Sequence, residues 1–373
     1  MNKIKALLFS VSLVFASLAH AQTINFIGLS DVHLNPFDLS AHYPGFNDDT
    51  NPFFFKRFIG SVAYISTHGK DGAILPEDEL PQFIIISGDF LAHSFADKVA
   101  NNKDPSICSR GVAACALATM GTIIKVIRET QNGVFEHTPI YITLGNNDFD
   151  TGDYRVNQAF LPQLAGSFYD YAHPDDGIAE DKEMFIKNFS ENEGAYSVAG
   201  LADDPNFNLL SLNTVLYANK KDDKGHLELA CVDNSKILDC KDFRDKQNNF
   251  ISNYINQTMQ DPKQRTLAIM HIPPYESGHG YDNDAKPALN KDFAKQAYTI
   301  AGHWHMYSKL NSVNGVMQNS VTFRKSVQTG FIVQTGFILY NFSNATISQA
   351  KHCSIADPSK LSGSAVDLNF SCQ

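Results

Sequence analysis

The sequence predicts an α/β protein in which helices cover the outer faces of β-sheets. Two observations lead to this prediction. Short apolar runs typical of strands alternate along the chain with longer stretches that suit helices, which is the pattern of layered α/β folds. Most of the apolar runs also end in a small polar motif, as expected where strands deliver side chains to a crevice at their carboxyl ends.

The strand-like runs are short, and most of them end next to a glycine or a polar side chain. In chain order the predicted strands are 23–29 (TINFIGL), 83–87 (FIIIS), 139–144 (PIYITL), 207–212, 266–270 and 298–301. Helices are predicted between them at 54–67, 113–130, 182–188 and 242–257.

The C-terminal part of the chain contains a short repeat. The sequence VQTGFI at 327–332 recurs at once at 333–338, and its even period keeps the same face of a strand inward. This favours a duplicated edge strand or hairpin. No linker separates a second domain, although 373 residues would allow one large or two smaller domains. We therefore expect one domain at 22–340 and a polar C-terminal tail at 341–373.

The N-terminus has the three parts of a secretory signal peptide. Lys3 and Lys5 precede the apolar stretch 6–18, and the small-x-small sequence AHA follows at 19–21. The apolar stretch is too short to span a membrane as a helix, and no later segment reaches the required length. We expect residues 1–21 to be removed and the mature protein to be secreted or periplasmic.

The cysteines fit an oxidising compartment. Their number is even, which favours disulfides after export. A zinc–cysteine site is disfavoured because the chain contains no Cys-x-x-Cys. The simplest pairing joins neighbours in sequence and pins the C-terminal tail, although the sequence leaves other pairings open. The three neighbouring pairs are Cys108 with Cys115, Cys231 with Cys240, and Cys353 with Cys372.

The charge of the chain limits its partners. Removal of residues 1–21 changes the formal net charge from −10 to −12, because two lysines and no acids are lost. Broad binding of nucleic acid or of anionic membranes needs basic surface and is not expected. A small anionic substrate stays compatible with the charge if bound cations dominate the local field. The sequence does not predict an oligomeric state.

Five short motifs carry side chains that can bind divalent metal ions. In the first, a carboxylate and an imidazole stand two residues apart at a strand end and point to the same side. Mixed nitrogen and oxygen ligands favour zinc, iron or manganese over calcium or magnesium. Each motif alone is weak, but their order and strand-end placement predict a site for two ions. The motifs are Asp31-Val-His33, Gly88-Asp89, Gly145-Asn146-Asn147-Asp148, His271 and Gly302-His303-Trp304-His305.

In this order the motifs resemble those of the calcineurin-like metallophosphoesterase superfamily, across nearly the whole mature chain. Three further features resemble its acid sphingomyelinase-like phosphodiesterases: His93 four residues after Asp89, Ile-Pro-Pro after His271, and Asn213 in the sequence SLNT. The resemblance implies a four-layer αββα sandwich of two mixed sheets, with a binuclear metal site at the strand C-terminal ends. We expect no additional N-terminal lipid-presenting domain.

The resemblance also implies which residues hold two divalent ions, with zinc favoured and iron or manganese as alternatives. A hydroxide shared by the metals would attack phosphorus in line with the leaving group. The implied activity is cleavage of phosphodiester or pyrophosphate bonds in small substrates such as nucleotides or phospholipid head groups. The first ion would be bound by Asp31, His33, Asp89 and His305, and the second by the bridging Asp89 with Asn146, His271 and His303.

One position departs from the common superfamily pattern. Many members have a histidine directly after the asparagine ligand, and this histidine protonates the leaving group. This chain has Asn147 there, and an amide cannot donate such a proton. We expect His93 to be the catalytic acid instead, because histidine titrates near the working pH. The alternatives are an acid-type phosphomonoesterase or polyphosphatase, and a catalytically inactive relative that binds metal and phosphate.

Other assignments are left open by the sequence. Asp148 could orient a ligand imidazole or Asn147, or only form a turn. Arg155 could contact a substrate phosphate or lie on the surface, and His279 could line the substrate entrance or be solvated. Trp304 is expected to pack behind the ligands. Substrate choice is expected to depend on loops at 36–53, 151–164 and 275–286.

Overall fold

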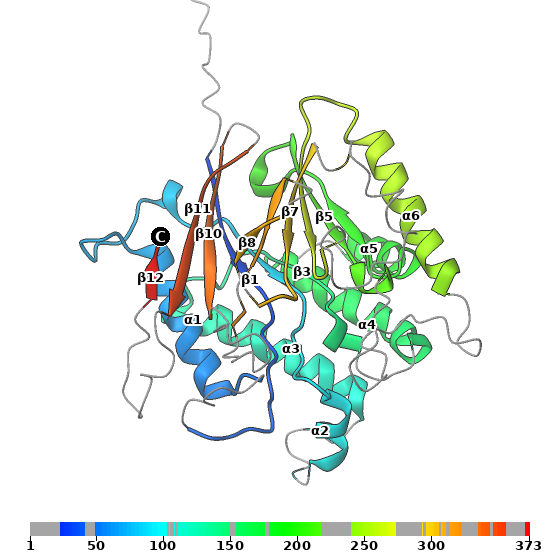
Figure 1. The fold of residues 1–373 in the computed structure, drawn as a ribbon, viewed down its shortest axis with the longest axis horizontal. Coiled ribbons are helices and arrows are strands. Elements are labelled where there is room, and N and C mark those ends of the chain that lie inside the picture. The colour runs from blue at the N-terminus through cyan, green and yellow to red at the C-terminus, as the bar shows by residue number, and fades with distance from the viewer. Residues whose placement is uncertain are drawn as a thin grey trace, which may run out of the picture.

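Two six-stranded mixed β-sheets form the centre of the molecule (Figure 1). In Figure 1 the strands β10–β12 lie to the left of β5 and β7, and helix α6 lies at the right. The computed structural model describes residues 23–41, 49–102, 104, 108, 111–149, 154–175, 179–217, 240–273, 293, 296–305, 307–310, 314–318, 320–321, 335–343, 346–355 and 370–373.

The first sheet has the order β12-β11-β10-β1-β2-β3. The neighbours β1, β2 and β3 run parallel, whereas β10, β11 and β12 add antiparallel strands on the other side of β1. The strands are β1 (Ile24–Leu29), β2 (Phe83–Ser87), β3 (Ile140–Thr143), β10 (Gly336–Ser343), β11 (Thr346–Ile355) and β12 (Phe370–Cys372). The three strands predicted in the first half of the chain are therefore confirmed.

The second sheet has the order β4-β5-β6-β7-β9-β8. Its middle strands β5, β6, β7 and β9 are parallel, and β4 and β8 pair antiparallel at the two edges. The strands are β4 (Tyr196–Val198), β5 (Phe207–Leu212), β6 (Arg265–Met270), β7 (Ala297–Ala301), β8 (Ser308–Lys309) and β9 (Gly315–Met317). The predicted strands at 207–212, 266–270 and 298–301 correspond to β5, β6 and β7.

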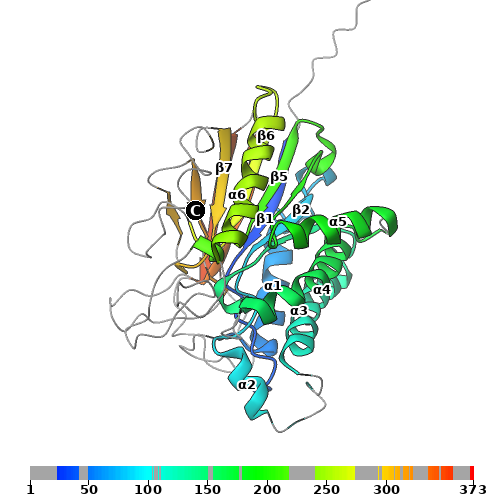
Figure 2. The ribbon, with the colours of Figure 1, turned by 90° about the vertical axis from the view of Figure 1, so that its right-hand side faces the viewer.

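Six α-helices are described, and four of them match predicted helices. Helix α1 begins where the Asn51 side chain accepts a hydrogen bond from the Phe54 amide at 2.8 Å, with Pro52 in the first turn. Figure 2 shows α1, α3, α4 and α5 grouped together on one side of the molecule. The helices are α1 (Pro52–Thr67), α2 (Phe95–Asn101), α3 (Val112–Glu129), α4 (Tyr154–Ala172), α5 (Ala179–Glu191) and α6 (Cys240–Gln257).

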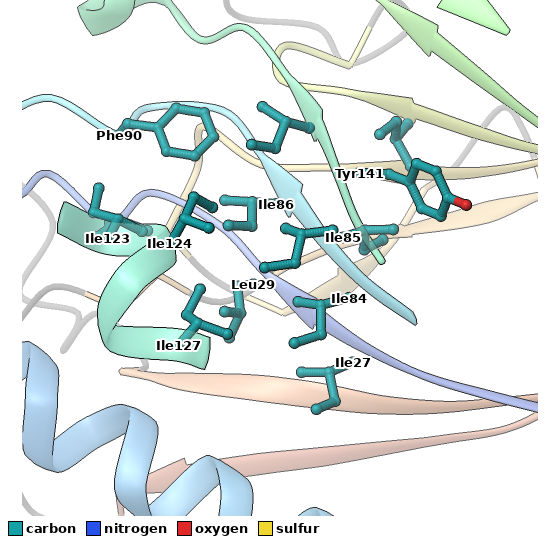
Figure 3. Close-up of a cluster of buried hydrophobic side chains, with 14 of the residues drawn as sticks. Ile27, Leu29, Ile84, Ile85, Ile86, Phe90, Ile123, Ile124, Ile127 and Tyr141 are labelled. Atoms are coloured by element: carbon teal, nitrogen blue, oxygen red, sulfur yellow. The ribbon is translucent and has the colours of Figure 1, made fainter. Parts of the chain in front are cut away.

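The strands bury both faces, and this produces the four-layer arrangement. On the first sheet, side chains of β1 and β2 that include Ile27, Leu29 and Ile86 pack against the isoleucines of α3 (Figure 3). On the second sheet, Leu210, Leu212, Ala268 and Met270 form a separate apolar cluster with Ile251 and Tyr254 of α6. The alternate residues of both sheets face inward. The predicted α/β architecture, with helices on the outer faces, is thus confirmed.

Contacts between the sheets align their strand ends. The rings of Phe207 in β5 and Phe342 in β10 stack with centroids 4.5 Å apart. Nearer the carboxyl ends, the Thr143 hydroxyl at the end of β3 donates to the Leu212 carbonyl of β5 at 2.8 Å. Because these contacts hold β3 against β5, the carboxyl ends of parallel strands from both sheets lie at the same edge of the sandwich.

One predicted loop is wrong. Residues 151–164 were expected as a loop that contributes to substrate choice, but α4 begins at Tyr154 and runs through Pro162. Proline removes a backbone donor and normally disfavours a helix interior. Here Leu161, Leu164 and Phe168 are buried at helical spacing, and this packing outweighs the proline. Residues 275–286, another predicted loop, lie outside the described part of the chain.

The described residues after 340 form strands of the first sheet and not a separate tail. The expected boundary at residue 340 falls within β10, and β11 and β12 follow it. Polar residues in β10 and β11 concealed a strand pattern in which Phe342, Cys353 and Ile355 are buried. The Cys353–Cys372 disulfide joins β11 to β12. Most of the VQTGFI repeat lies outside the described residues, and the end of its second copy begins β10.

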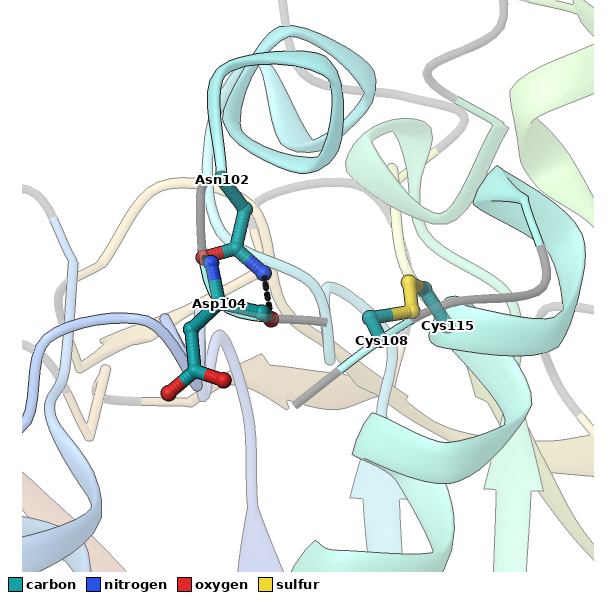
Figure 4. The surroundings of a disulfide bond; sticks show 4 residues. All are labelled: Asn102, Asp104, Cys108 and Cys115. Atoms are coloured by element: carbon teal, nitrogen blue, oxygen red, sulfur yellow. Dashed lines mark hydrogen bonds between the residues drawn. A yellow bond between two sulfur atoms is a disulfide. The ribbon is translucent and has the colours of Figure 1, made fainter. Parts of the chain in front are cut away.

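A second disulfide joins Cys108 to Cys115 in the first turns of α3 (Figure 4). Beside it, the Asn102 side chain donates to the Asp104 carbonyl at 2.7 Å. Two of the three expected pairs are therefore present, and Cys231 of the third lies outside the described residues. Among the described residues, no helix combines the length and apolar character needed to cross a membrane.

Candidate metal centre

The expected metal ligands lie directly after the carboxyl ends of strands from both sheets. Asp31 and His33 follow β1, and Asp89 follows β2. Asn146 begins the short 3₁₀-helix η3 (Asn146–Phe149) after β3. From the second sheet, His271 follows β6, and His303 and His305 follow β7. Since the two sheets pack face to face, these strand ends converge on one point.

Two groups of three side chains have ligand atoms within 4.8 Å of one another: Asp31, His33 and His305, and Asp31, Asp89 and His271. All five residues are buried. The His305 Nε2 atom lies 3.2 Å from Asp31 Oδ1, and also 3.2 Å from His33 Nε2. On the other side, His271 Nε2 lies 3.2 Å from Asp89 Oδ2. The two groups share Asp31.

These spacings suit ligands of a common cation. Two ligands of a tetrahedral zinc ion, each at about 2.1 Å, are separated by about 3.4 Å. The donor set of imidazole nitrogens and carboxylate oxygens is the one that zinc, iron and manganese prefer. In addition, His305 Nδ1 is buried and has no hydrogen-bond partner in the described structure. The residues present therefore fit divalent metal ions.

The remaining expected ligands stand beside His271. Asn146 Oδ1 lies 3.1 Å from His271 Nε2, and the His303 ring is 5.2 Å from the His271 ring in an edge-on arrangement. The His303 backbone amide donates to both Asp31 carboxylate oxygens at 3.1 Å. The structure thus brings all seven predicted ligand residues together at one edge of the sandwich.

Backbone carbonyls orient two of the imidazoles. His33 donates from Nδ1 to the Leu91 carbonyl at 3.3 Å, and His271 donates from Nδ1 to the Ser87 carbonyl at 2.7 Å. In the neutral ring, each bond leaves the lone pair on Nε2, which is the atom directed at the carboxylates. Such contacts fix the tautomer and direction of a metal-binding histidine before the ion arrives.

The electrostatics of the cluster favour a cation. Burial alone would raise the pKa of Asp89, but His271 and His33 hold it well below its usual value. Burial would lower the pKa of His271, but Asp89, Asp31 and the Ser87 carbonyl raise it to about 9. Without a metal, the buried carboxylates therefore retain a proton on His271. The same negative field would attract a divalent ion.

Asn147 contacts the expected bridging carboxylate. Its backbone amide donates to Asp89 Oδ1 at 2.8 Å, and its side-chain amide donates to Asp89 Oδ2 at 2.7 Å. Asn147 therefore donates a hydrogen bond to each carboxylate oxygen of Asp89. The structure assigns this residue a contact to a ligand, whereas the histidine expected there in many relatives is a proton donor.

Asp148 holds the backbone of the loops that carry the ligands, and it does not orient an imidazole or Asn147. Its carboxylate accepts hydrogen bonds from the amides of Asp89, Phe90 and Leu91 at 3.1, 2.9 and 3.2 Å, and from Gly145 at 2.8 Å. It thereby joins the segment after β2 to the segment after β3. Burial and the nearby Asp89 charge raise the pKa of Asp148 to about 7. These four backbone bonds were not foreseen from the sequence.

Five of the expected ligands have a left-handed backbone conformation. Such a conformation is uncommon for residues other than glycine and is concentrated at functional sites. It turns each side chain back toward the centre immediately after the strand ends. The positive φ angles are 52° at Asp31, 45° at His33, 54° at Asp89, 75° at His303 and 57° at His305.

Glycines in the motifs allow the two sheets to approach. A Cβ atom on Gly88 would lie 2.8 Å from both the Gly145 Cα and the His271 Nδ1 atoms. A Cβ atom on Gly302 would lie 2.1 Å from the Ser30 hydroxyl and 2.7 Å from the Ser87 carbonyl oxygen. Both positions therefore exclude a side chain for lack of space. This explains why glycine precedes the ligand in these motifs.

His93 stands next to the cluster. Its ring lies 4.1 Å from that of His33, nearly parallel, and 33% of its side chain is exposed. This exposure leaves it accessible to a substrate. Asp49 binds it at Nδ1, a contact that sequence reasoning missed because the two residues are 44 positions apart. Trp304 is half-buried between the ligands His303 and His305.

Two candidate residues cannot be placed at the site. His279 lies outside the described residues, and the Arg155 side chain is not among those described. Asn213 is buried after β5, and its amide donates to the Glu193 carbonyl at 2.8 Å. It therefore supports the loop beside the second sheet.

Resemblance to solved structures is distant, whereas a family model matches most of the chain. A structure of PhoD matches 95% of this chain and 69% of its own, with 10% identity and a TM-score of 0.47. A conserved uncharacterized protein of Streptococcus pneumoniae TIGR4, described as a predicted phosphoesterase, matches 89% of both chains with 9% identity and a TM-score of 0.28. No curated protein matches significantly. The calcineurin-like phosphoesterase model matches residues 24–307, and the chain therefore belongs to this family of metal-dependent phosphoester hydrolases.

Proposed function

We propose that this protein is an exported binuclear hydrolase that cleaves phosphodiester or pyrophosphate bonds in small molecules, with nucleotides and phospholipid head groups as the leading substrate classes. The observation that carries the proposal is the arrangement of a buried carboxylate–imidazole cluster beside a partly exposed histidine. The cluster can hold the ions, and His93 can reach a substrate that is bound to them.

In this proposal Asp31, His33, Asp89 and His305 hold one ion, and Asp89, Asn146, His271 and His303 hold the other. Zinc is the favoured metal, with iron or manganese as alternatives. When bound, the two ions neutralise the phosphoryl oxygens and acidify the attacking water. Within the family, the proposal assigns the chain to the acid sphingomyelinase-like phosphodiesterases, and the resemblance in the motifs supports this assignment. Residues 1–21 would be the signal peptide, and the disulfides are compatible with a secreted or periplasmic protein.

His93 would donate a proton to the leaving oxygen. Asn147 has no titratable group, and its two N–H contacts to Asp89 give it a ligand-supporting role instead. Support for this role comes from the His93 ring, which stacks on that of His33 at 4.1 Å, and from its side chain, which is 33% exposed. The donor would therefore approach from the side of the β2–α2 segment, and not from the segment after β3.

The first test is metal content together with hydrolysis. The purified protein would be assayed with bis-p-nitrophenyl phosphate, p-nitrophenyl phosphate and ATP across acid to neutral pH. Two metals per chain and turnover of the diester or of ATP are expected. Turnover of the monoester alone would favour an acid-type phosphomonoesterase. Two metals with no turnover of any substrate would indicate a metal-binding protein without catalysis and would refute the proposal.

The second test addresses the proton donor. His93→Gln should reduce turnover of substrates with alkyl leaving groups about 100-fold or more, because an alkoxide requires protonation. It should affect p-nitrophenyl esters much less, since p-nitrophenolate leaves without a proton. His137→Gln is the matched control, because the His137 side chain is 72% exposed and His137 precedes β3, whereas the ligand Asn146 follows it. Equal losses on both substrate types would exclude His93 as the acid.

A further inference from the structure

Asp49 and Lys98 hold His93 at three points. One Asp49 oxygen accepts hydrogen bonds from the His93 backbone amide at 2.9 Å and from His93 Nδ1 at 3.0 Å. The other Asp49 oxygen forms an ion pair with Lys98 Nζ at 3.0 Å. Lys98 Nζ also donates to the His93 carbonyl. The backbone and ring of His93 are therefore fixed by one buried carboxylate and one lysine.

Asp49 belongs to a rigid part of the scaffold. The next residue, Thr50, donates its amide to the His33 carbonyl at 2.9 Å and accepts from the Asn35 amide at 2.8 Å. Asn51 then caps α1. On its other side, the segment after β1 is bonded to the segment after β2, with the Leu34 amide 2.8 Å from the Phe90 carbonyl. Asp49, His33 and His93 are thus held by adjacent, hydrogen-bonded segments.

Charge balance keeps Asp49 ionised. Burial would raise the pKa of Asp49, but its hydrogen bonds from His93 and the nearby Lys98 charge lower it below the usual value. A carboxylate can only accept hydrogen bonds, so the His93 Nδ1 atom must carry a hydrogen in this contact. Free neutral histidine prefers the other tautomer. The contact therefore selects the less common form of the ring.

We infer that Asp49 is a positioning residue for His93: it retains a proton on Nδ1 and directs Nε2, on the opposite side of the ring, toward the leaving group of a phosphate ester. Lys98 balances the Asp49 charge and holds the His93 carbonyl. This inference rests on the proposed function, in which His93 is the proton donor. Carboxylates that orient a functional imidazole commonly act in this way.

In the proposed reaction, the proton moves from Nε2 of His93 to the leaving oxygen. The imidazolium of His93 carries hydrogens on both nitrogens. As the bond between phosphorus and the leaving oxygen breaks, that oxygen keeps the electron pair and takes the Nε2 hydrogen, which releases an alcohol. His93 is then neutral, with its remaining hydrogen on Nδ1 bonded to Asp49. Without Asp49, the ring could rotate or keep its hydrogen on Nε2, and its orientation would be lost.

The tautomer can be measured without substrate. The zinc-loaded protein, labelled with ¹⁵N in histidine, would be studied by long-range ¹H–¹⁵N correlation at a pH where His93 is neutral. The His93 signals are assigned by their loss in His93→Gln. The wild type is expected to show the Nδ1–H tautomer, and Asp49→Leu the Nε2–H tautomer. An unchanged tautomer in Asp49→Leu would overturn the inference.

Kinetics test the consequence of the contact. Asp49→Leu should lower kcat for an alkyl phosphodiester about 10–100-fold with little change in KM, while metal content stays at the wild-type level. With bis-p-nitrophenyl phosphate, Asp49→Leu should lower kcat less than about threefold, because p-nitrophenolate leaves without a proton. Lys98→Met retains the Asp49–His93 bond and should keep the tautomer. Equal losses on both substrates would overturn the positioning role.

The two proposals can fail separately. If Asp49→Leu changes the tautomer but His93→Gln does not affect alkyl substrates, the proton-donor role of His93 is wrong although the contact is correct. If His93→Gln shows the leaving-group effect and Asp49→Leu shows neither change, the positioning role is wrong and the proposed function stands. Should Asp49→Leu unfold, the wild-type protein alone provides the test, because an Nε2–H tautomer of its neutral His93 would contradict the hydrogen bond from Nδ1 to Asp49.

Discussion

Gly302→Ala tests whether close contact between the two sheets sets the geometry of the metal centre. Gly302 follows β7 of the second sheet, and its Cα faces Ser30 and Ser87 of the first. The added Cβ would lie 2.1 Å from the Ser30 hydroxyl and 2.7 Å from the Ser87 carbonyl oxygen, whereas ordinary contact begins at 3.4 Å. Some atoms must therefore move.

The two neighbours differ in how they can move. The Ser30 hydroxyl can rotate away, although it then loses its hydrogen bond to Asp31. The Ser87 carbonyl is backbone in β2, and it accepts the Nδ1 hydrogen of His271 at 2.7 Å. A shift of this carbonyl would reorient a metal ligand. Overpacking of this kind costs about 1–3 kcal/mol of folding free energy. Loss of the contacts that orient ligands typically lowers metal affinity about 10–100-fold.

The assay is a zinc titration against a competing chelator, combined with chemical unfolding of the metal-free protein. Gly121→Ala is the matched control, because Gly121 lies in α3 and its added Cβ would be 3.9 Å from the nearest atom. This control should be as stable as the wild type or more stable, since alanine favours a helix over glycine. Wild-type zinc affinity and stability in Gly302→Ala would refute the argument that this contact positions the ligands.

Three further predictions concern other parts of the structure. A metal ion present at 1,000 times its dissociation constant stabilises the native protein by about 4 kcal/mol, so chelation should lower the free energy of unfolding by this amount. Added zinc should restore the stability. If calorimetry shows no change on chelation, the ion does not bind the native cluster. Asn147→Ala removes the 2.7 Å contact to Asp89 and should weaken metal retention on dialysis about tenfold, whereas full retention would show that the contact is dispensable. Burial lowers the pKa of His352 below the ordinary value of 6.5. The unfolded protein therefore takes up this proton at a higher pH than the folded protein does. The contribution of neutral His352 to the free energy of unfolding is fully present above pH 6.5 and is lost as the pH falls below that value. In urea unfolding at about pH 7.5 and about pH 5.5, His352→Gln should show a smaller loss of stability than the wild type, and an equal loss would exclude this contribution.

The strands and ligands that could be predicted from the sequence are those that one local pattern of residues identifies. A short apolar run followed by a ligand motif identified β1, β2, β3, β6 and β7, because buried parallel strands are continuous in apolar residues. The same runs located the ligands, since parallel strands end at one edge of a sheet. Local patterns failed for α4, in which packing outweighs Pro162, and for β11, in which polar side chains alternate with buried ones.

Contacts between distant segments could not be predicted from the sequence. Asp49 meets His93 only because Thr50 pairs with the segment after β1, and no spacing rule connects these positions. Asp148 was a recognisable part of a motif, but its role depends on three consecutive amides after β2. Such roles follow from the path of the backbone in three dimensions, which the residue types alone do not reveal.

The left-handed ligand residues affect how a mutational scan of this centre should be designed. Alanine at Asp31, His33 or Asp89 would remove a ligand and also place a poorly suited residue at a positive φ angle. The measured loss would then combine metal binding with the conformational preference of the replacement. Glycine adopts this backbone region at no steric cost and carries no ligand atom. Paired glycine and alanine variants would therefore separate the contribution of each ligand atom from that of the chain that carries it.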